Sequence, residues 1–188
     1  MNKKIVAAAF ALLPSLAFAH PGHTDGFAAA FAHPFTGVDH LLMMLSVGVF
    51  AGRIGGSVRW QLPLAFLSAM TVGWLLGTSG FAFASIESGI AAGLIALGVL
   101  LAWQVDMPRF AQFAIIAIFA SLHGMAHGSE LSNATPFVTT MGFLAATAML
   151  HGVGLFVAAL LPPEKKNIYR AFGLLLATIG GGFLSANL

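Results

Sequence analysis

Two short segments of the chain, HPFTGVDH and HGMAHGSE, combine imidazole with carboxylate side chains at spacings that suit metal binding. Their histidine and carboxylate residues are His33, Asp39, His40, His123, His127 and Glu130. Residues four and seven apart share one face of a helix, so the last three would form a single stripe. Imidazole suits Ni, Cu, Zn and Fe, whereas a cage of carboxylates alone suits Mg, Ca or Mn. The residue types therefore predict a divalent transition-metal site, and the spacing alone does not choose among these metals.

Some members of this set have a second interpretation. A single histidine in an apolar helix is often a hydrogen-bonding contact between helices. Asp39 could orient a liganding histidine without touching the metal itself. Pro34 and Gly37 are expected to loosen the backbone between His33 and Asp39, because proline removes a backbone donor and both residues favour kinks.

Four further residues are weaker candidates for metal binding: His20, His23, Met44 and His151. Met44 follows His40 by one helical turn, but a methionine at this spacing is also common as a packing residue of the hydrophobic core. His151 would be either a relay contact for the ion or a packed polar residue. The two N-terminal histidines would form either a loose capture site or a tail without fixed structure.

The composition decides the class of protein that must position these residues. Of 188 residues, 59% are hydrophobic and 7% are charged, whereas a soluble domain has about 25% charged residues. This excludes an ordinary soluble enzyme, and it excludes disorder, which requires low hydrophobicity and high charge. The net charge of +2 gives no support for a nucleic-acid partner, and the absence of cysteine excludes disulfides and cysteine-ligated zinc.

Residues 1–19 are typical of a cleaved signal peptide. Lys3 and Lys4 form a basic start, residues 5–13 are apolar but too few to span a bilayer, and residues 17–19 form an A-x-A cleavage site. Cleavage would leave residues 20–188 as a single permease domain with its N-terminus in the periplasm. The alternative is that this segment stays attached as an additional membrane helix.

Six apolar stretches follow, and each has about the 20 residues that a helix needs to cross the hydrocarbon core. They are 28–52, 61–80, 86–104, 110–128, 137–161 and 168–186. The basic residues after position 19 all lie in alternate connections between these stretches or, for the last of them, at the start of the sixth stretch: Arg53, Arg59, Arg109, Lys165, Lys166 and Arg170. Basic loops stay in the cytoplasm. We therefore predict an all-α polytopic protein of the bacterial inner membrane, with six transmembrane helices and both mature termini in the periplasm.

This topology places the two histidine segments at a similar depth. One lies near the start of the first span and the other near the end of the fourth, so both belong to the periplasmic half. Short loops and the absence of a G-x-x-x-x-G-K-[ST] motif exclude ATP hydrolysis by that route and imply no ATPase subunit. A metal-ion permease is the leading hypothesis.

Two other functions use the same side chains. One is an intramembrane zinc-dependent metalloenzyme with Glu130 as general base, and the other is a bis-histidine haem protein for electron transfer. Against the enzyme, Gly124 follows His123, where the H-E-x-x-H motif has glutamate.

The segment HPFTGVDHLLMM resembles the H-P-x-x-G-x-D-H-x-x-x-M signature of the HupE/UreJ family of nickel or nickel/cobalt transporters, and HGMAHGSE resembles the second histidine-rich motif of that family. The resemblance covers essentially the whole chain, including the six spans and the signal peptide. It implies uptake of Ni²⁺, with Co²⁺ possible, by facilitated diffusion or secondary transport. It also implies no enzymatic activity, no prosthetic group and a functional link to hydrogenase or urease maturation. By motif, the site residues are His33, Asp39, His40, His123, His127 and Glu130.

Overall fold

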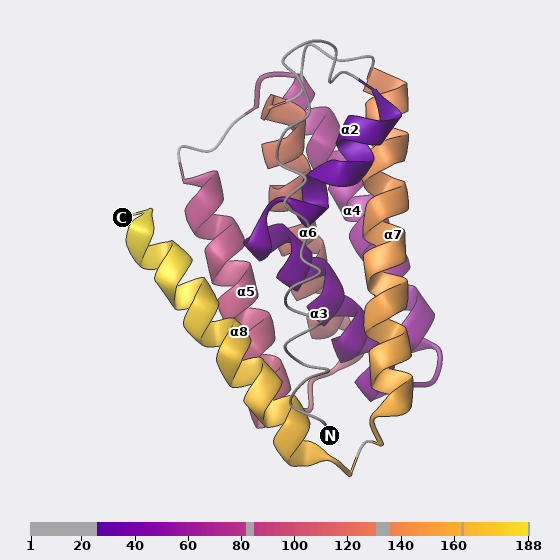
Figure 1. Ribbon diagram of the computed structural model, residues 1–188, viewed down its shortest axis with the longest axis vertical. Coiled ribbons are helices and arrows are strands. Elements are labelled where there is room, and N and C mark those ends of the chain that lie inside the picture. The colour runs from indigo at the N-terminus through magenta and orange to yellow at the C-terminus, as the bar shows by residue number, and fades with distance from the viewer. Residues whose placement is uncertain (1–25, 82–84, 131–135, 163, 188) are drawn as a thin grey trace, which may run out of the picture.

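The computed structural model describes residues 26–81, 85–130, 136–162 and 164–187, and these residues form helices without any strand. The helices are α2 (Phe27–Ala32), the 3₁₀ helix η1 (His33–Phe35), α3 (Val38–Ile54), α4 (Val58–Thr78), α5 (Ile86–Trp103), α6 (Arg109–Glu130), α7 (Pro136–Leu160) and α8 (Lys166–Ala186). The long helices form one bundle, and the short α2 lies against α7 near one end (Figure 1).

Five of these helices, α4 to α8, are individually long and apolar enough to cross a membrane. A sixth span forms only if α2 and η1 are taken together with α3, and this pair is bent by 83°. The prediction of an all-helical polytopic membrane protein is confirmed. The first stretch, 28–52, differs from the others because it is a broken helix rather than one continuous rod.

The break follows from the residues around it. Pro34 stands at the start of η1, where its missing N–H group costs little. Thr36 ends the turn, because both its N–H group (2.9 Å) and its hydroxyl group (2.7 Å) donate to the carbonyl oxygen of His33. Gly37 is extended, with φ −95° and ψ 119°, so the helical path stops there and α3 begins in a new direction.

Close contacts between backbones hold the helix pairs together. α3 packs on α7, α4 on α6 and α5 on α8. A Cβ atom added at Gly124 of α6 would meet the carbonyl oxygen of Met70 in α4, and one added at Gly48 of α3 would meet the carbonyl oxygen of His151 in α7. Such approach between membrane helices requires small residues at the contact.

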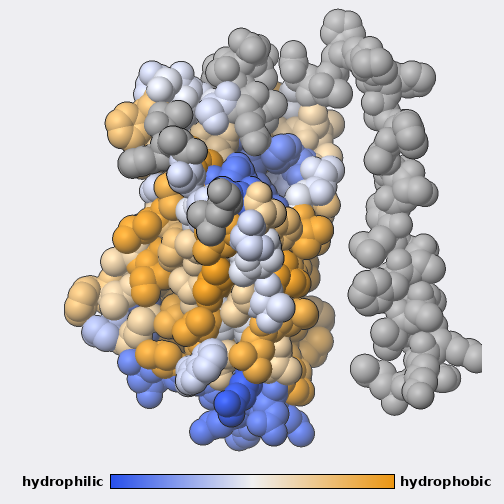
Figure 2. All heavy atoms as spheres, turned by 90° about the vertical axis from the view of Figure 1, so that its left-hand side faces the viewer, coloured by the Kyte–Doolittle hydropathy of each residue, from blue (hydrophilic) through white to orange (hydrophobic). Residues whose placement is uncertain are grey.

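The outer surface has the polarity of a membrane protein. Large apolar side chains are exposed along the bundle, including Phe110 (76%), Phe137 (73%) and Leu160 (65%). Hydrophobic side chains cover the middle of the face in Figure 2, and hydrophilic ones gather at its lower end and, in a second group, towards its upper end. At the lower end α3, α5 and α7 finish and α4, α6 and α8 begin (Figure 1). The basic residues at positions 53, 59, 109, 165, 166 and 170 belong to these helix ends.

Candidate metal centre

Three histidines from separate helices meet inside the bundle. His33 comes from η1, His40 from α3 and His127 from α6, and one ring nitrogen from each lies within 4.8 Å of the others. The ring centroid of His127 is 4.9 Å from that of His33 and 4.8 Å from that of His40. His40 and His127 are buried. The break at residues 36–37 makes this possible, since it allows His33 to approach a histidine on the other side of the bend.

The spacing of these nitrogens is slightly wider than a bound ion requires. Two nitrogens that each lie about 2.1 Å from one ion are at most about 4.2 Å apart. A pair at the 4.8 Å limit would therefore have to approach by about half an ångström. The three nitrogens are therefore close to the spacing of ligands on one ion, but not at it.

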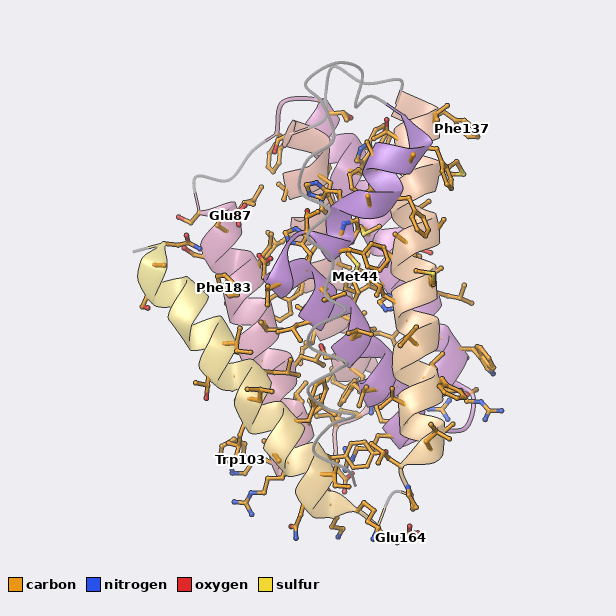
Figure 3. All side chains as sticks on the ribbon, viewed as in Figure 1. Met44, Glu87, Trp103, Phe137, Glu164 and Phe183 are labelled. Carbon is orange, nitrogen blue, oxygen red and sulfur yellow. The ribbon has the colours of Figure 1, made fainter. Side chains whose placement is uncertain are left out.

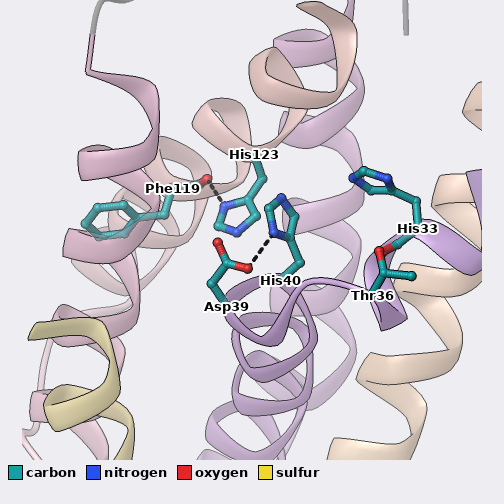
Figure 4. A network of polar contacts seen from close by, with 6 residues as sticks. All are labelled: His33, Thr36, Asp39, His40, Phe119 and His123. Carbon is teal, nitrogen blue, oxygen red and sulfur yellow. Dashed lines mark hydrogen bonds and ion pairs between the residues drawn. The ribbon is translucent and has the colours of Figure 1, made fainter. Parts of the chain in front are cut away.

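Asp39 contacts His40 rather than the three-histidine cluster as a whole. The Nδ1–H group of His40 donates to Oδ1 of Asp39 over 2.9 Å (Figure 4). This leaves Nε2 of His40 buried and without a hydrogen-bond partner among the described residues. Gly37 provides the room, because a Cβ atom there would lie 2.9 Å from Oδ1 of Asp39 and 3.1 Å from Nδ1 of His40. Asp39 thus has the position of a residue that orients a ligand.

His123 lies beside the cluster and is fully buried. Its Nδ1–H group donates to the carbonyl oxygen of Phe119 over 2.9 Å (Figure 4). A carbonyl oxygen only accepts, so Nε2 carries the lone pair in the neutral ring. Its ring centroid is 5.1 Å from that of His40. In the described part of the chain this Nε2 has no hydrogen-bond partner.

The remaining candidates lie elsewhere or outside the described residues. Glu130 is the last residue of α6, and its side chain is not described. His20 and His23 also lie outside the described residues. Met44 and His151 contact each other across α3 and α7, and neither belongs to the three-histidine cluster.

Two aromatic residues complete the surroundings of the histidines, and the sequence did not single them out. Phe143 of α7 stacks on His127 with centroids 4.3 Å apart, and it is perpendicular to the ring of His33, with centroids 5.6 Å apart. Phe66 of α4 lies 6.0 Å from His123. The chain has 17 phenylalanines, and 12 of them lie in the six apolar stretches, so no local pattern distinguishes these two.

Comparison with known proteins identifies the family of the chain. A family model described as "HupE / UreJ protein" matches residues 8–183. The chain belongs to the HupE/UreJ family. A member of this family named Protein HupE, from Rhizobium leguminosarum bv. viciae, is 41% identical over 174 residues, which cover 90% of this chain and 86% of that protein. No solved structure matches the chain.

HupE/UreJ proteins are transporters associated with nickel and cobalt, not enzymes. The prediction that the chain is not an enzyme is therefore confirmed, and the comparisons do not favour the metalloenzyme or haem hypothesis. The family also implies a metal ion as substrate rather than a prosthetic group. The liganding role of each histidine and carboxylate stays a prediction.

Proposed function

We propose that the chain carries Ni²⁺, with Co²⁺ as an alternative cargo, inward across the bacterial inner membrane through the three-histidine cluster. The observation that supports this most directly is the meeting of His33, His40 and His127 within 4.8 Å in a bundle of membrane-type helices. Ionisable side chains in such helices are costly, so a convergent set indicates a site for a substrate or ion.

The chemistry of the donors favours a transition metal over Mg²⁺ or Ca²⁺. The clustered donors are imidazole nitrogens, which suit Ni, Cu, Zn and Fe. Asp39 adds one negative charge through His40 and strengthens that ring as a ligand. In this proposal His33, Asp39, His40, His123, His127 and Glu130 form the site, and His20 and His23 form a capture site ahead of it.

The distribution of charge supports one orientation of the bundle. The end that carries the basic residues lies in the cytoplasm under the positive-inside rule. The histidine cluster, built from η1, the start of α3 and the last turns of α6, then lies towards the periplasm. Removal of residues 1–19 as a signal peptide would leave residues 20–188 as the permease, with both ends in the periplasm.

The membrane potential is sufficient to drive uptake. An inside-negative potential contributes about 2.3 kcal/mol per charge per 100 mV, hence about 4.6 kcal/mol for a divalent ion. That corresponds to an accumulation of roughly a thousandfold at equilibrium. Facilitated diffusion or secondary transport therefore fits without an ATPase subunit. The imported metal would supply nickel enzymes such as hydrogenase or urease, the link that the family resemblance implies.

Uptake by whole cells tests the proposal. We expect cells that produce the His127→Ala variant to accumulate radioactive Ni²⁺ no faster than cells without the protein. Asp106→Asn is the control, because Asp106 is exposed at the opposite, basic end of the bundle. Equal amounts of both variants in the membrane must be verified by immunoblot. Undiminished uptake by His127→Ala would contradict a path through the three-histidine cluster.

A further inference from the structure

A second group of buried donor atoms lies deeper in the bundle, around His151 of α7. The ring of His151 is 1% exposed, and its Nδ1–H group donates to the carbonyl oxygen of Met44 over 2.7 Å. The lone pair is therefore on Nε2, which has no hydrogen-bond partner among the described residues. An unpaired buried acceptor is costly, so its presence requires an explanation.

Two thioether sulfurs converge in the same region. The hydroxyl group of Thr147 lies 3.2 Å from Sδ of Met44 and 3.8 Å from Sδ of Met70. Thr147 and His151 are four residues apart on α7 and share one face of that helix. Met44 lies within the bundle, between its two ends (Figure 3). Side chains from α3, α4 and α7 thus bring two sulfurs to one hydroxyl group, one helical turn from the imidazole of His151, in a buried part of the bundle.

This inner group connects to the three-histidine cluster through aromatic rings. His123 lies 5.1 Å from His40. The ring of Phe66 lies 6.0 Å from His123 and 4.9 Å from His151, perpendicular to the latter within 5°. A continuous row of rings therefore leads from the cluster to His151, with Phe66 between the two inner imidazoles.

We infer that Met44, Met70 and His151 form a second metal station, at which a divalent transition-metal ion is held by thioether and imidazole donors during its passage. This inference rests on the proposed transport function. Thioether and imidazole ligands suit transition metals and do not suit Mg²⁺ or Ca²⁺. The hydroxyl group of Thr147 donates to Sδ of Met44 and lies 3.8 Å from Sδ of Met70, and His151 is oriented by its bond to the Met44 carbonyl. If His151 served only to link α3 to α7, the hydrogen bond of its Nδ1 atom would be enough, and the buried Nε2 atom without a partner would have no explanation.

The absence of cysteine makes this station directly testable. Any sulfur bound to Ni²⁺ must come from methionine, because the chain has no cysteine. We would measure the nickel-edge X-ray absorption of the purified full-length protein with two equivalents of Ni²⁺ added. A sulfur shell near the metal is expected for the parent protein, and it should disappear in the Met44→Leu/Met70→Leu double variant. Exchange of methionine for leucine conserves volume and is usually tolerated in a packed core, so this variant should fold.

A matched control and a second readout separate the inference from the proposed function. Met141→Leu/Met149→Leu changes two exposed methionines of α7 and should keep the sulfur shell. Equilibrium dialysis with Ni²⁺ should show one ion fewer for Met44→Leu/Met70→Leu than for the parent. Binding of Ni²⁺ by nitrogen and oxygen alone in the parent would overturn the inner station and leave the outer cluster standing. No binding of Ni²⁺ by the parent would overturn both.

Discussion

Replacement of Asp39 by asparagine removes one negative charge next to the proposed ion and changes little else. The side-chain shape is kept, and the asparagine carbonyl can still accept the Nδ1–H group of His40, which now lies 2.9 Å from the carboxylate. The affected quantity is the affinity of the cluster for a divalent ion, because the ring of His40 becomes a weaker ligand when its partner is neutral.

The size of the effect can be bounded from the geometry. An ion on Nε2 of His40 would lie about 6.5 Å from the carboxylate, and at an effective dielectric constant of about 20 the attraction is about 5 kcal/mol. This is a ceiling, because the Asp39 side chain is 17% exposed and water screens part of the charge. Loss of such orienting partners typically weakens metal binding about 10- to 100-fold, or about 1.4–2.8 kcal/mol. We therefore expect a loss of binding free energy of about 1.4–2.8 kcal/mol, below the electrostatic ceiling.

The assay is initial Ni²⁺ uptake as a function of external concentration, for the parent and for Asp39→Asn. The half-saturating concentration should rise about 10- to 100-fold, with the amount of protein in the membrane unchanged. Asp106→Asn controls for the loss of one carboxylate, since that residue is exposed at the other end of the molecule. If Asp39→Asn takes up Ni²⁺ like the parent at both low and saturating concentrations, Asp39 only shapes the start of α3 and the charge argument is wrong.

Three further predictions concern the bundle and its orientation. Gly124→Leu should sharply reduce the amount of folded protein extracted in mild detergent, because the leucine side chain would collide with the α4 backbone. Gly152→Leu is the control and should be tolerated, since nothing lies within 4 Å of a Cβ atom there. Equal yields of the two variants would refute this role of the close contact. Single cysteines at Ser79 and Lys165, introduced into this cysteine-free chain, should react with an impermeant thiol reagent from opposite sides of the membrane, and reaction from one side would rule out the six-span topology. Mass spectrometry of the purified protein should find His20 as the first residue, and an intact Met1 would show that no signal peptide is cleaved.

The helical spans could be predicted from sequence because each is a nearly uninterrupted apolar run. The ends predicted for the last five stretches lie within three residues of those observed for α4 to α8. The broken shape of the first span was harder to predict. Pro34 and Gly37 indicated a loosened backbone, but the 83° bend also depends on how α2 packs on α7, and that contact lies far away in the chain.

The candidate site could likewise be predicted only in part. Topology predicted that the two histidine segments would lie at one depth, and the rings of His40 and His127 do lie 4.8 Å apart. A depth argument does not determine how each helix is rotated about its axis or which helices are neighbours. The sequence left open whether Asp39 binds the ion or orients a histidine, and Asp39 pairs with His40. The depth argument could not predict that Phe143 stacks on His127 or that His151 contacts the Met44 carbonyl.

Transport by the purified protein alone tests the proposed function most directly. Proteoliposomes with an imposed inside-negative potential of about 100 mV should take up Ni²⁺ rapidly, and uptake should slow when an ionophore collapses that potential. Liposomes with His127→Ala should behave like liposomes without protein. Influx through the parent no faster than through protein-free liposomes, or undiminished influx through His127→Ala, would contradict the proposal that this chain conducts the ion through its histidine cluster.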